Sequence, residues 1–435
     1  MRNKYINGIV LFALLILLSG CQNKNPALPH TLVNFAHLQH LSEEIMLNDR
    51  TMTIVHIYAE YPDYHWVTDP DEGMTCVDDV ARAAVLYLRH YKYRGSASSR
   101  EQAKKMLEFI LHMQAPNGLF YNFMFDDRSI NTTHQNSVPV ASWWSWRAIW
   151  ALAEAAEILK DASPEYGNRL SASIEKTFPA LDSLLQYYPQ TRQIKGMELP
   201  TWLPYQTAAD QAAVIIMALL PYYQVSANEK VLGYIQRFGE GMIQMQKGDS
   251  AVVPFGAFLS WENSWHAYGN SQACALLRFA AARNKAPFVR AALKEVKFFY
   301  PFLMEQNFWS SFEVILQGEG YQFANIKSYP QIAYGLRPMV WAGLRAQEAT
   351  GSQRFARLAG EMACWLLGKN AVGLPMYDYR TGRCFDGIND KNSINRNSGA
   401  ESTIEALLTL LEVEQNPTAK KMVWDYFRSR LSKIE

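Results

Sequence analysis

Helical segments that recur in pairs constrain the fold of this chain more than any other feature. Within a pair, the link is short and carries helix-stopping or helix-starting residues, such as Gly351-Ser352 or Asn416-Pro417. The first members begin near residues 78, 142, 207, 265, 331 and 399, so they recur every 58–68 residues. Such a repeat predicts one array rather than several domains. The segments with apolar residues at helical spacing are Asp78–Arg94, Ser99–Gln114, Ser142–Lys160, Glu165–Gln186, Thr207–Gln224, Asn228–Gln246, Trp265–Arg283, Phe288–Leu303, Gln331–Thr350, Gln353–Leu367, Gly399–Gln415 and Thr418–Ser432.

Six helical hairpins predict an all-α (α/α)6 toroid, in which six inner helices are ringed by six outer ones. We assign residues 75–435 to this toroid and residues 31–74 to an N-terminal extension that packs on it. An open solenoid is the alternative, although its repeats are usually shorter. The long connections all precede inner helices, so they share one rim of the ring. Large loops on a rigid scaffold usually carry function, so we expect the site at that rim.

Composition and motifs exclude several classes of protein. The chain is 49% hydrophobic and has a net charge of +1, so it is neither disordered nor a basic nucleic-acid-binding protein. We expect a monomer. The cysteines beyond residue 75 are far apart and show no zinc-binding spacing, so buried thiols are expected. We expect no cofactor and no metal, with a calcium ion at Asp69 and Asp71 left open.

The N-terminus has the pattern of a targeting segment. Arg2 and Lys4 precede an apolar run from Ile9 to Leu18, which is too short to span a bilayer comfortably. Leu-Ser-Gly-Cys then ends at Cys21 and resembles a bacterial lipoprotein box. We therefore expect a signal peptide at residues 1–20, a lipidated Cys21 and a tether at residues 21–30. The expected location is the outer membrane facing the periplasm, with the cell surface second; an uncleaved anchor helix is the alternative.

Carboxylates stand at the starts of the first and last inner helices, which are neighbours if the ring closes. Glycoside hydrolysis needs two such groups, one to protonate the leaving oxygen and one to activate water or attack. The predicted catalytic residues are Asp78, Asp79 and Glu401. Adjacent helical residues lie about 100° apart, so only one of the two aspartates faces the axis directly. These residues also have possible structural roles in place of catalytic ones. Asp78 could form an ion pair with Arg82, and Glu401 could form a capping box with Ser398.

Aromatic residues gather in the same connections. Eight of the 12 tryptophans lie there, in the N-terminal extension or in the first turn of an inner helix, and such rings suit the C–H faces of sugars. Arginines at this rim would favour a uronate if they line the cleft. The predicted substrate-binding residues are Trp66, Arg82, Trp143, Trp144, Trp146, Arg147, Asp210, Glu262, Trp265, Tyr268, Tyr334, Asn395 and Arg396.

Two segments resemble a known enzyme family. Trp365-Leu366-Leu367-Gly368-Lys369-Asn370, followed by Gly373, is similar to the Leu-Gly-x-Asn-Pro segment of glycoside hydrolase family nine. The acid-bearing helix from Asn397 to Leu408 lies where that family places its C-terminal acid. The family's Asp-Ala-Gly-Asp sequence is replaced by Val77-Asp78-Asp79-Val80, and its His-His-Arg segment is missing. The chain thus distantly resembles toroidal glycosidases, which implies a glycoside hydrolase. A glycan-binding lipoprotein and a lyase or epimerase acting on uronates remain alternatives.

Overall fold

The computed structural model describes residues 29–160, 163–283, 285–318 and 320–432. Residues Val33–Glu435 form one compact unit. The predicted signal peptide, Cys21 and the tether up to residue 28 lie outside the described residues. Among the helices that are described, none is both long and apolar enough to cross a membrane.

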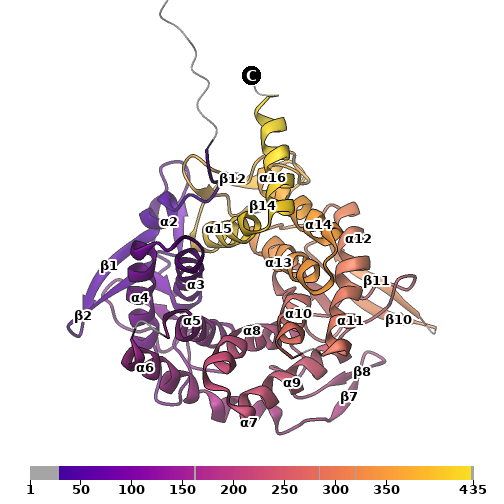
Figure 1. Cartoon of the computed structure of the whole chain (residues 1–435), viewed down its shortest axis with the longest axis horizontal. Helices are drawn as coiled ribbons and strands as arrows, with labels where there is room; N and C mark the ends of the chain where they lie inside the picture. Colours follow the sequence, from indigo (N-terminus) through magenta and orange to yellow (C-terminus); the bar gives the residue numbers. More distant parts are fainter. Residues whose placement is uncertain (1–28, 161–162, 284, 319, 433–435) are drawn as a thin grey trace, which may run out of the picture. The chain divides into compact units, whose positions relative to one another are not determined.

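Six inner helices form a closed ring (Figure 1). Each contacts the next in chain order, and the last, α15, contacts the first, α3. This closure confirms the predicted toroid and excludes an open solenoid. The inner helices are α3 (Val77–Arg94), α5 (Trp143–Leu159), α8 (Ala209–Ser226), α10 (Gln272–Arg283), α13 (Ala333–Thr350) and α15 (Ala400–Gln415).

The outer layer holds the partner of each inner helix. Two partners that the sequence predicts as continuous helices are interrupted. One breaks where Pro179, which cannot donate a backbone hydrogen bond, occupies the first turn of a new helix. The other contains a π-helical turn, Glu295–Phe299. The outer helices are α4 (Ala97–His112), α6 (Pro164–Glu175) with α7 (Phe178–Leu185), α9 (Glu229–Gln244), α11 (Ala286–Lys294) with α12 (Tyr300–Glu305), α14 (Gln353–Ala363) and α16 (Pro417–Leu431).

Five inner helices begin within two residues of their predicted starts, but the prediction for the fourth is wrong. The sequence predicts a helix from Trp265, whereas α10 begins at Gln272. Residues Ser264–His266 instead form strand β9, which pairs with β10, and a 3₁₀ turn follows at Ala267–Gly269. The pairing with β10 satisfies the backbone hydrogen-bonding groups of these residues, which a helix would otherwise satisfy internally. The segment therefore forms a strand despite its helical spacing of apolar residues.

The long connections fold into small antiparallel sheets that the sequence patterns did not predict. One pair, β5–β6, joins the residues before α3 to the connection ahead of α5. Residues ahead of α3 contact the helices, since α2 (Ala36–Leu41) contacts α15 and β2 contacts α4. The strands are β1 (Ser42–Leu47), β2 (Arg50–Val55), β3 (Tyr58–Glu60), β4 (His65–Val67), β5 (Thr75–Cys76), β6 (Phe123–Met124), β7 (Thr191–Ile194), β8 (Met197–Pro200), β9 (Ser264–His266), β10 (Ser311–Gln317), β11 (Gly320–Lys327), β12 (Tyr377–Asp378), β13 (Arg383–Cys384), β14 (Gly387–Asp390) and β15 (Ser393–Asn395).

Candidate active site

A cavity of about 580 Å³ lies at the N-terminal ends of the inner helices. Its wall combines carboxylates, guanidinium groups and aromatic rings that come from α3, α5, α13, α15 and the rim connections. We call it the axial cavity. The residues that line it are Ile57, Tyr58, Glu72, Cys76, Asp78, Asp79, Arg82, Asn122, Phe123, Asn136, Ser142, Trp143, Trp144, Arg147, Tyr268, Ile332, Tyr334 and Glu401.

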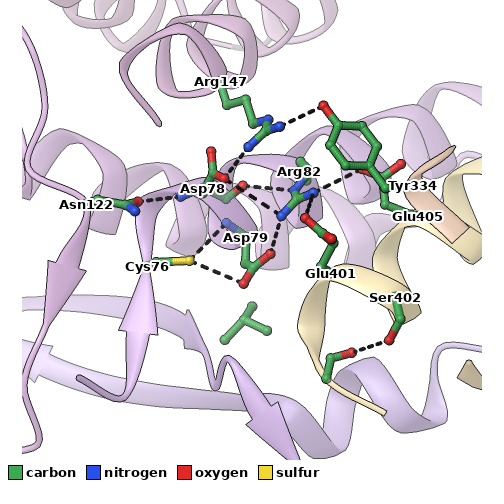
Figure 2. A network of polar contacts seen from close by, with 12 residues as sticks. Cys76, Asp78, Asp79, Arg82, Asn122, Arg147, Tyr334, Glu401, Ser402 and Glu405 are labelled. Carbon is green, nitrogen blue, oxygen red and sulfur yellow. Dashed lines mark hydrogen bonds and ion pairs between the residues drawn. The ribbon is translucent and has the colours of Figure 1, made fainter. Parts of the chain in front are cut away.

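Asp78 is the aspartate of the pair that is more open to the axial cavity. Its side chain is 20% exposed, compared with 4% for Asp79. Its backbone N–H donates to Asn122 Oδ1 at 3.1 Å, and its Oδ2 accepts from Arg147 of α5 (Figure 2). The nearest Arg82 nitrogen lies 3.9 Å from the same oxygen. Asp78 therefore pairs mainly across the helix interface, and the predicted pair along α3 is secondary.

Asp79 is buried beneath this contact. Cys76 caps α3 by accepting the Asp79 N–H, and its thiol donates to Asp79 Oδ2 at 3.2 Å. Arg82 donates to Asp79 Oδ1 at 2.6 Å. Burial raises the pKa of Asp79 to about 6, although the Arg82 charge opposes the rise. Asp79 therefore holds the Arg82 guanidinium in place.

The Arg82 guanidinium connects the first and last inner helices. It is buried, and it donates to Glu401 at 2.8 Å and to Glu405 at 3.3 Å, both on α15 (Figure 2). The Glu401 side chain is 43% exposed, so one oxygen is held while the group stays open to the cavity. Ring closure thus brings Asp78 and Glu401 to the two terminal nitrogens of one guanidinium.

Glu401 does not form the capping box. The N-cap residue of α15 is Gly399, which makes Glu401 the second helical residue rather than the third. Ser398 Oγ instead accepts the Cys384 N–H at 3.1 Å. Asp386 satisfies this end of the helix, because its Oδ1 accepts from the Gly399 N–H and from Ser402 Oγ. The capping explanation for Glu401 is therefore wrong.

The sequence analysis missed two buried residues of this network, Glu405 and Arg337. Glu405 is fully buried and accepts from Arg82 and from Arg337 of α13. The signal was a charge spacing: Arg82 and Arg89 lie seven residues apart, as do Glu405 and Glu412, in otherwise apolar helices. Seven residues are two helical turns, so each pair shares a face and points to the ring axis.

The same spacing produces a second ionic layer further along the axis. Arg89 donates to Glu154 of α5 at 2.6 Å and lies 3.5 Å from Glu412 of α15. Glu412 also accepts from Arg345 of α13. These contacts explain why charged residues occur inside a ring of helices: each is paired across a helix interface.

The structure brings nine of the predicted site residues to the axial cavity. The Arg147 guanidinium lies between the rings of Trp143 and Tyr334, at 5.0 and 5.1 Å from their centroids. It also donates to the Tyr334 hydroxyl at 2.7 Å, which fixes both side chains. The nine residues are Asp78, Asp79, Arg82, Trp143, Trp144, Arg147, Tyr268, Tyr334 and Glu401.

Two predicted substrate-binding tryptophans are fully buried instead. Trp146 donates from Nε1 to Gln211 Oε1 at 3.1 Å, inside the interface between α5 and α8. Trp265 stacks on Phe312 at 5.0 Å, because strand β9 packs its ring against the sheet β9–β10–β11, which we call the rim sheet. Neither ring lines the axial cavity, and their first-turn positions in the sequence did not reveal this.

Five further predicted residues lie outside the axial cavity. Trp66 is exposed but stacks on His56 at 3.9 Å. Asp210 is buried and pairs with His266 at 3.0 Å. Glu262 lies 3.8 Å from Arg192 in a rim connection. Asn395 ends strand β15, and the neighbouring Arg396 lies over the Tyr61 ring. The rim is wider than the axial cavity, so position on the rim alone does not place a side chain in the site.

Two further sequence features, the aspartates Asp69 and Asp71 and the segment around Trp365, lie outside the axial cavity. Asp69 Oδ1 accepts the N–H groups of Asp71 and Glu72, which is a turn contact, and no group of side chains in the described residues is arranged to hold a metal. The segment Cys364–Leu367, which carries part of the family resemblance, forms a 3₁₀ turn with Trp365 buried. It does not line the axial cavity.

Solved structures share this fold. A cellobiose 2-epimerase from Bacillus thermoamylovorans B4167 matches with a TM-score of 0.60 at 9% identity, over 86% of this chain and 95% of that one. A sugar epimerase from a ruminal bacterium matches with a TM-score of 0.56 at 13% identity, over 83% and 92%. A metagenome-derived glycoside hydrolase family 9 endoglucanase matches with a TM-score of 0.51 at 13% identity, over 88% and 80%. No protein-family model and no curated protein matches the sequence. The chain has the (α/α)6-toroid fold that these enzymes adopt.

Proposed function

We propose that this protein is a carbohydrate-active enzyme, and specifically a glycoside hydrolase that cleaves an oligosaccharide or polysaccharide in the axial cavity. The observation that carries the proposal is the placement of Asp78 and Glu401 around one guanidinium. Arg82 lies 3.9 Å from the first carboxylate and 2.8 Å from the second. Glycosidases need two carboxyl groups that flank the bond to be cleaved, and a shared guanidinium holds these two close to one another.

The exposures of the acids support distinct roles. Glu401 is the most open of them, and in its protonated form it gives its carboxyl proton to the leaving oxygen and becomes a carboxylate paired with Arg82. Asp78, ion-paired with Arg147, supplies the carboxylate that activates water or attacks the sugar. Asp79 and Arg82 hold the pair in place from below. The rings of Trp143 and Tyr268 provide faces on which a sugar can stack.

The charges at the axial cavity favour an uncharged sugar over a uronate. Among the described residues, four carboxylates line it but only two guanidinium groups, those of Arg82 and Arg147. Both guanidinium groups are buried and already paired with carboxylates. A uronate would meet an excess of negative charge rather than a free cation. Arg82 and Arg147 line the cavity, but on this charge balance we propose an uncharged sugar rather than a uronate as the substrate.

Imidazole chemistry has weaker support at this site. No histidine lines the axial cavity among the described residues. His266 contacts a lining residue, since it stacks on Tyr268 at 3.8 Å. Its Nε2 is held by Asp210, and its Nδ1 is buried, with Gly269 packed closely against the ring. A carboxylate mechanism is the simpler chemistry for this arrangement.

The test is product release from a panel of uncharged and acidic glycans. We would compare the wild type with Asp78→Asn, Glu401→Gln and a control, Glu101→Gln, whose side chain is exposed. Thermal unfolding would first establish that all variants are folded. New reducing ends from the wild type and control, with a loss of about 100-fold or more in the two site variants, would support the proposal. An ultraviolet-absorbing unsaturated product would instead identify a lyase. Binding without product would identify a glycan-binding protein.

We also propose that Cys21 anchors the mature protein to the outer membrane, facing the periplasm. The support is the sequence of residues 1–21. Mass spectrometry of the mature N-terminus should find an acylated Cys21, and Cys21→Ser should remove the acyl chains. An unmodified N-terminus that retains residues 1–20 would contradict the proposal.

A further inference from the structure

A second cavity, of about 460 Å³, adjoins the axial cavity. Tyr268 and Ile332 line both, so the two spaces meet at these side chains. The second cavity lies between the sheet β9–β10–β11 and the start of α13. Each volume falls within the roughly 300–1,000 Å³ of typical ligand pockets.

Aromatic side chains in this second cavity are held in place. Tyr268 is 45% exposed, and its ring stacks on His266, which Asp210 holds at 3.0 Å. Trp309 packs edge-on against Phe302 and Phe323 at 5.4 and 5.2 Å. A ring fixed in this way offers a flat face without the entropy cost of ordering a mobile side chain.

Polar groups surround these rings. Glu313 belongs to β10, whereas Asn325 and Lys327 belong to β11, and all three line the cavity. Asn325 and Lys327 are exposed. Flat apolar rings beside hydrogen-bonding groups suit a sugar, whose C–H face stacks while its hydroxyl groups bond.

We propose that this second cavity is a saccharide subsite, so that the substrate is an oligosaccharide long enough to occupy both cavities. The proposal rests on the proposed hydrolase function for its kinetic test. The subsite itself is assigned from the rim sheet and Tyr268, not from the catalytic carboxylates. Binding there would supply energy remote from the cleaved bond, which enzymes use to improve kcat/KM.

The kinetic test compares kcat/KM for oligosaccharides of increasing length. The variants are Trp309→Ala, Lys327→Ala and Asn325→Ala, and the control is Trp261→Ala, an exposed rim tryptophan that lines neither cavity. Loss of one aromatic contact should lower kcat/KM for long substrates by roughly 3–10-fold in Trp309→Ala. The shortest cleaved substrate and the Trp261→Ala control should be unaffected.

Equal losses on short and long substrates would overturn the subsite. Lys327→Ala changes an exposed side chain, so a length-dependent loss in this variant would support the subsite even if Trp309→Ala does not fold. If the wild type cleaves nothing, oligosaccharide binding is measured by titration calorimetry. Affinity that weakens in the cavity variants but not in Trp261→Ala keeps the subsite while the hydrolase proposal fails. Unchanged affinity overturns the subsite as well.

Discussion

Replacing Arg82 by methionine tests the ionic network that builds the site. The guanidinium is buried and contacts Asp79 at 2.6 Å, Glu401 at 2.8 Å and Glu405 at 3.3 Å. Removing one partner of a buried ion pair leaves a charge without compensation, at a cost of about 3–5 kcal/mol in the free energy of unfolding. For a domain of about 400 residues, this lowers the melting temperature by roughly 4–6 °C.

The loss in Arg82→Met should depend on pH. In the wild type, burial raises the pKa of Asp79 from 3.8 to about 6, so its contribution to stability is present below pH 4 and falls as the pH rises through 6. Without the Arg82 charge, this pKa rises further, and the loss extends to higher pH. We therefore expect Arg82→Met to be more destabilised relative to the wild type at pH 8 than at pH 5.

The assay is thermal unfolding followed by circular dichroism at pH 5, 6.5 and 8. Arg169→Met is the matched control, because Arg169 forms a two-pronged pair with Glu108 near the surface, which should be worth about 1 kcal/mol or less. The double variant Asp79→Asn/Arg82→Met should recover part of the loss, since it removes the unpaired charge. The reasoning is refuted if Arg82→Met loses no more than the control, or loses the same at pH 5 and pH 8.

Three further predictions follow from the described contacts. Burial raises the pKa of Glu295 to about 8, so the stability that depends on its protonated form is lost as the pH rises through 8. The Glu295→Gln variant should show a smaller decrease in melting temperature between pH 6 and pH 9 than the wild type. An equal decrease in both proteins would contradict this prediction. Trp146→Phe should lower the free energy of unfolding by about 1–3 kcal/mol without changing glycan affinity. Trp143→Ala should instead weaken glycan affinity at nearly unchanged stability. Calorimetry measures the affinities and melting curves measure the stabilities; the opposite pattern would place Trp146 in the site. An uncharged oligosaccharide should have a kcat/KM at least about tenfold above that of its uronate counterpart, a difference of roughly 1.4 kcal/mol; a preference for the uronate would refute the charge argument.

Much of the architecture was predictable because it follows from local periodicity. Helical spacing, glycine and proline at the links and a nearly constant repeat predict six hairpins, and five inner helices begin within two residues of expectation. Once these helix starts are known, the carboxylates that stand at the first and last of them can be recognised from the sequence. The start of α10 could not, since it depends on the pairing of β9 with β10, whose sequences lie about 45 residues apart.

The sequence by itself determined which residues lie at the rim, because rim position follows from order along the chain. The tertiary structure decided which of them face each other. Closure of the ring puts Glu401 and Glu405 against Arg82, more than 300 residues away in sequence. The rotation of each helix about its own axis then buries Trp146 and opens Trp143. That rotation is set by packing against neighbouring helices, so no single segment of sequence specifies it.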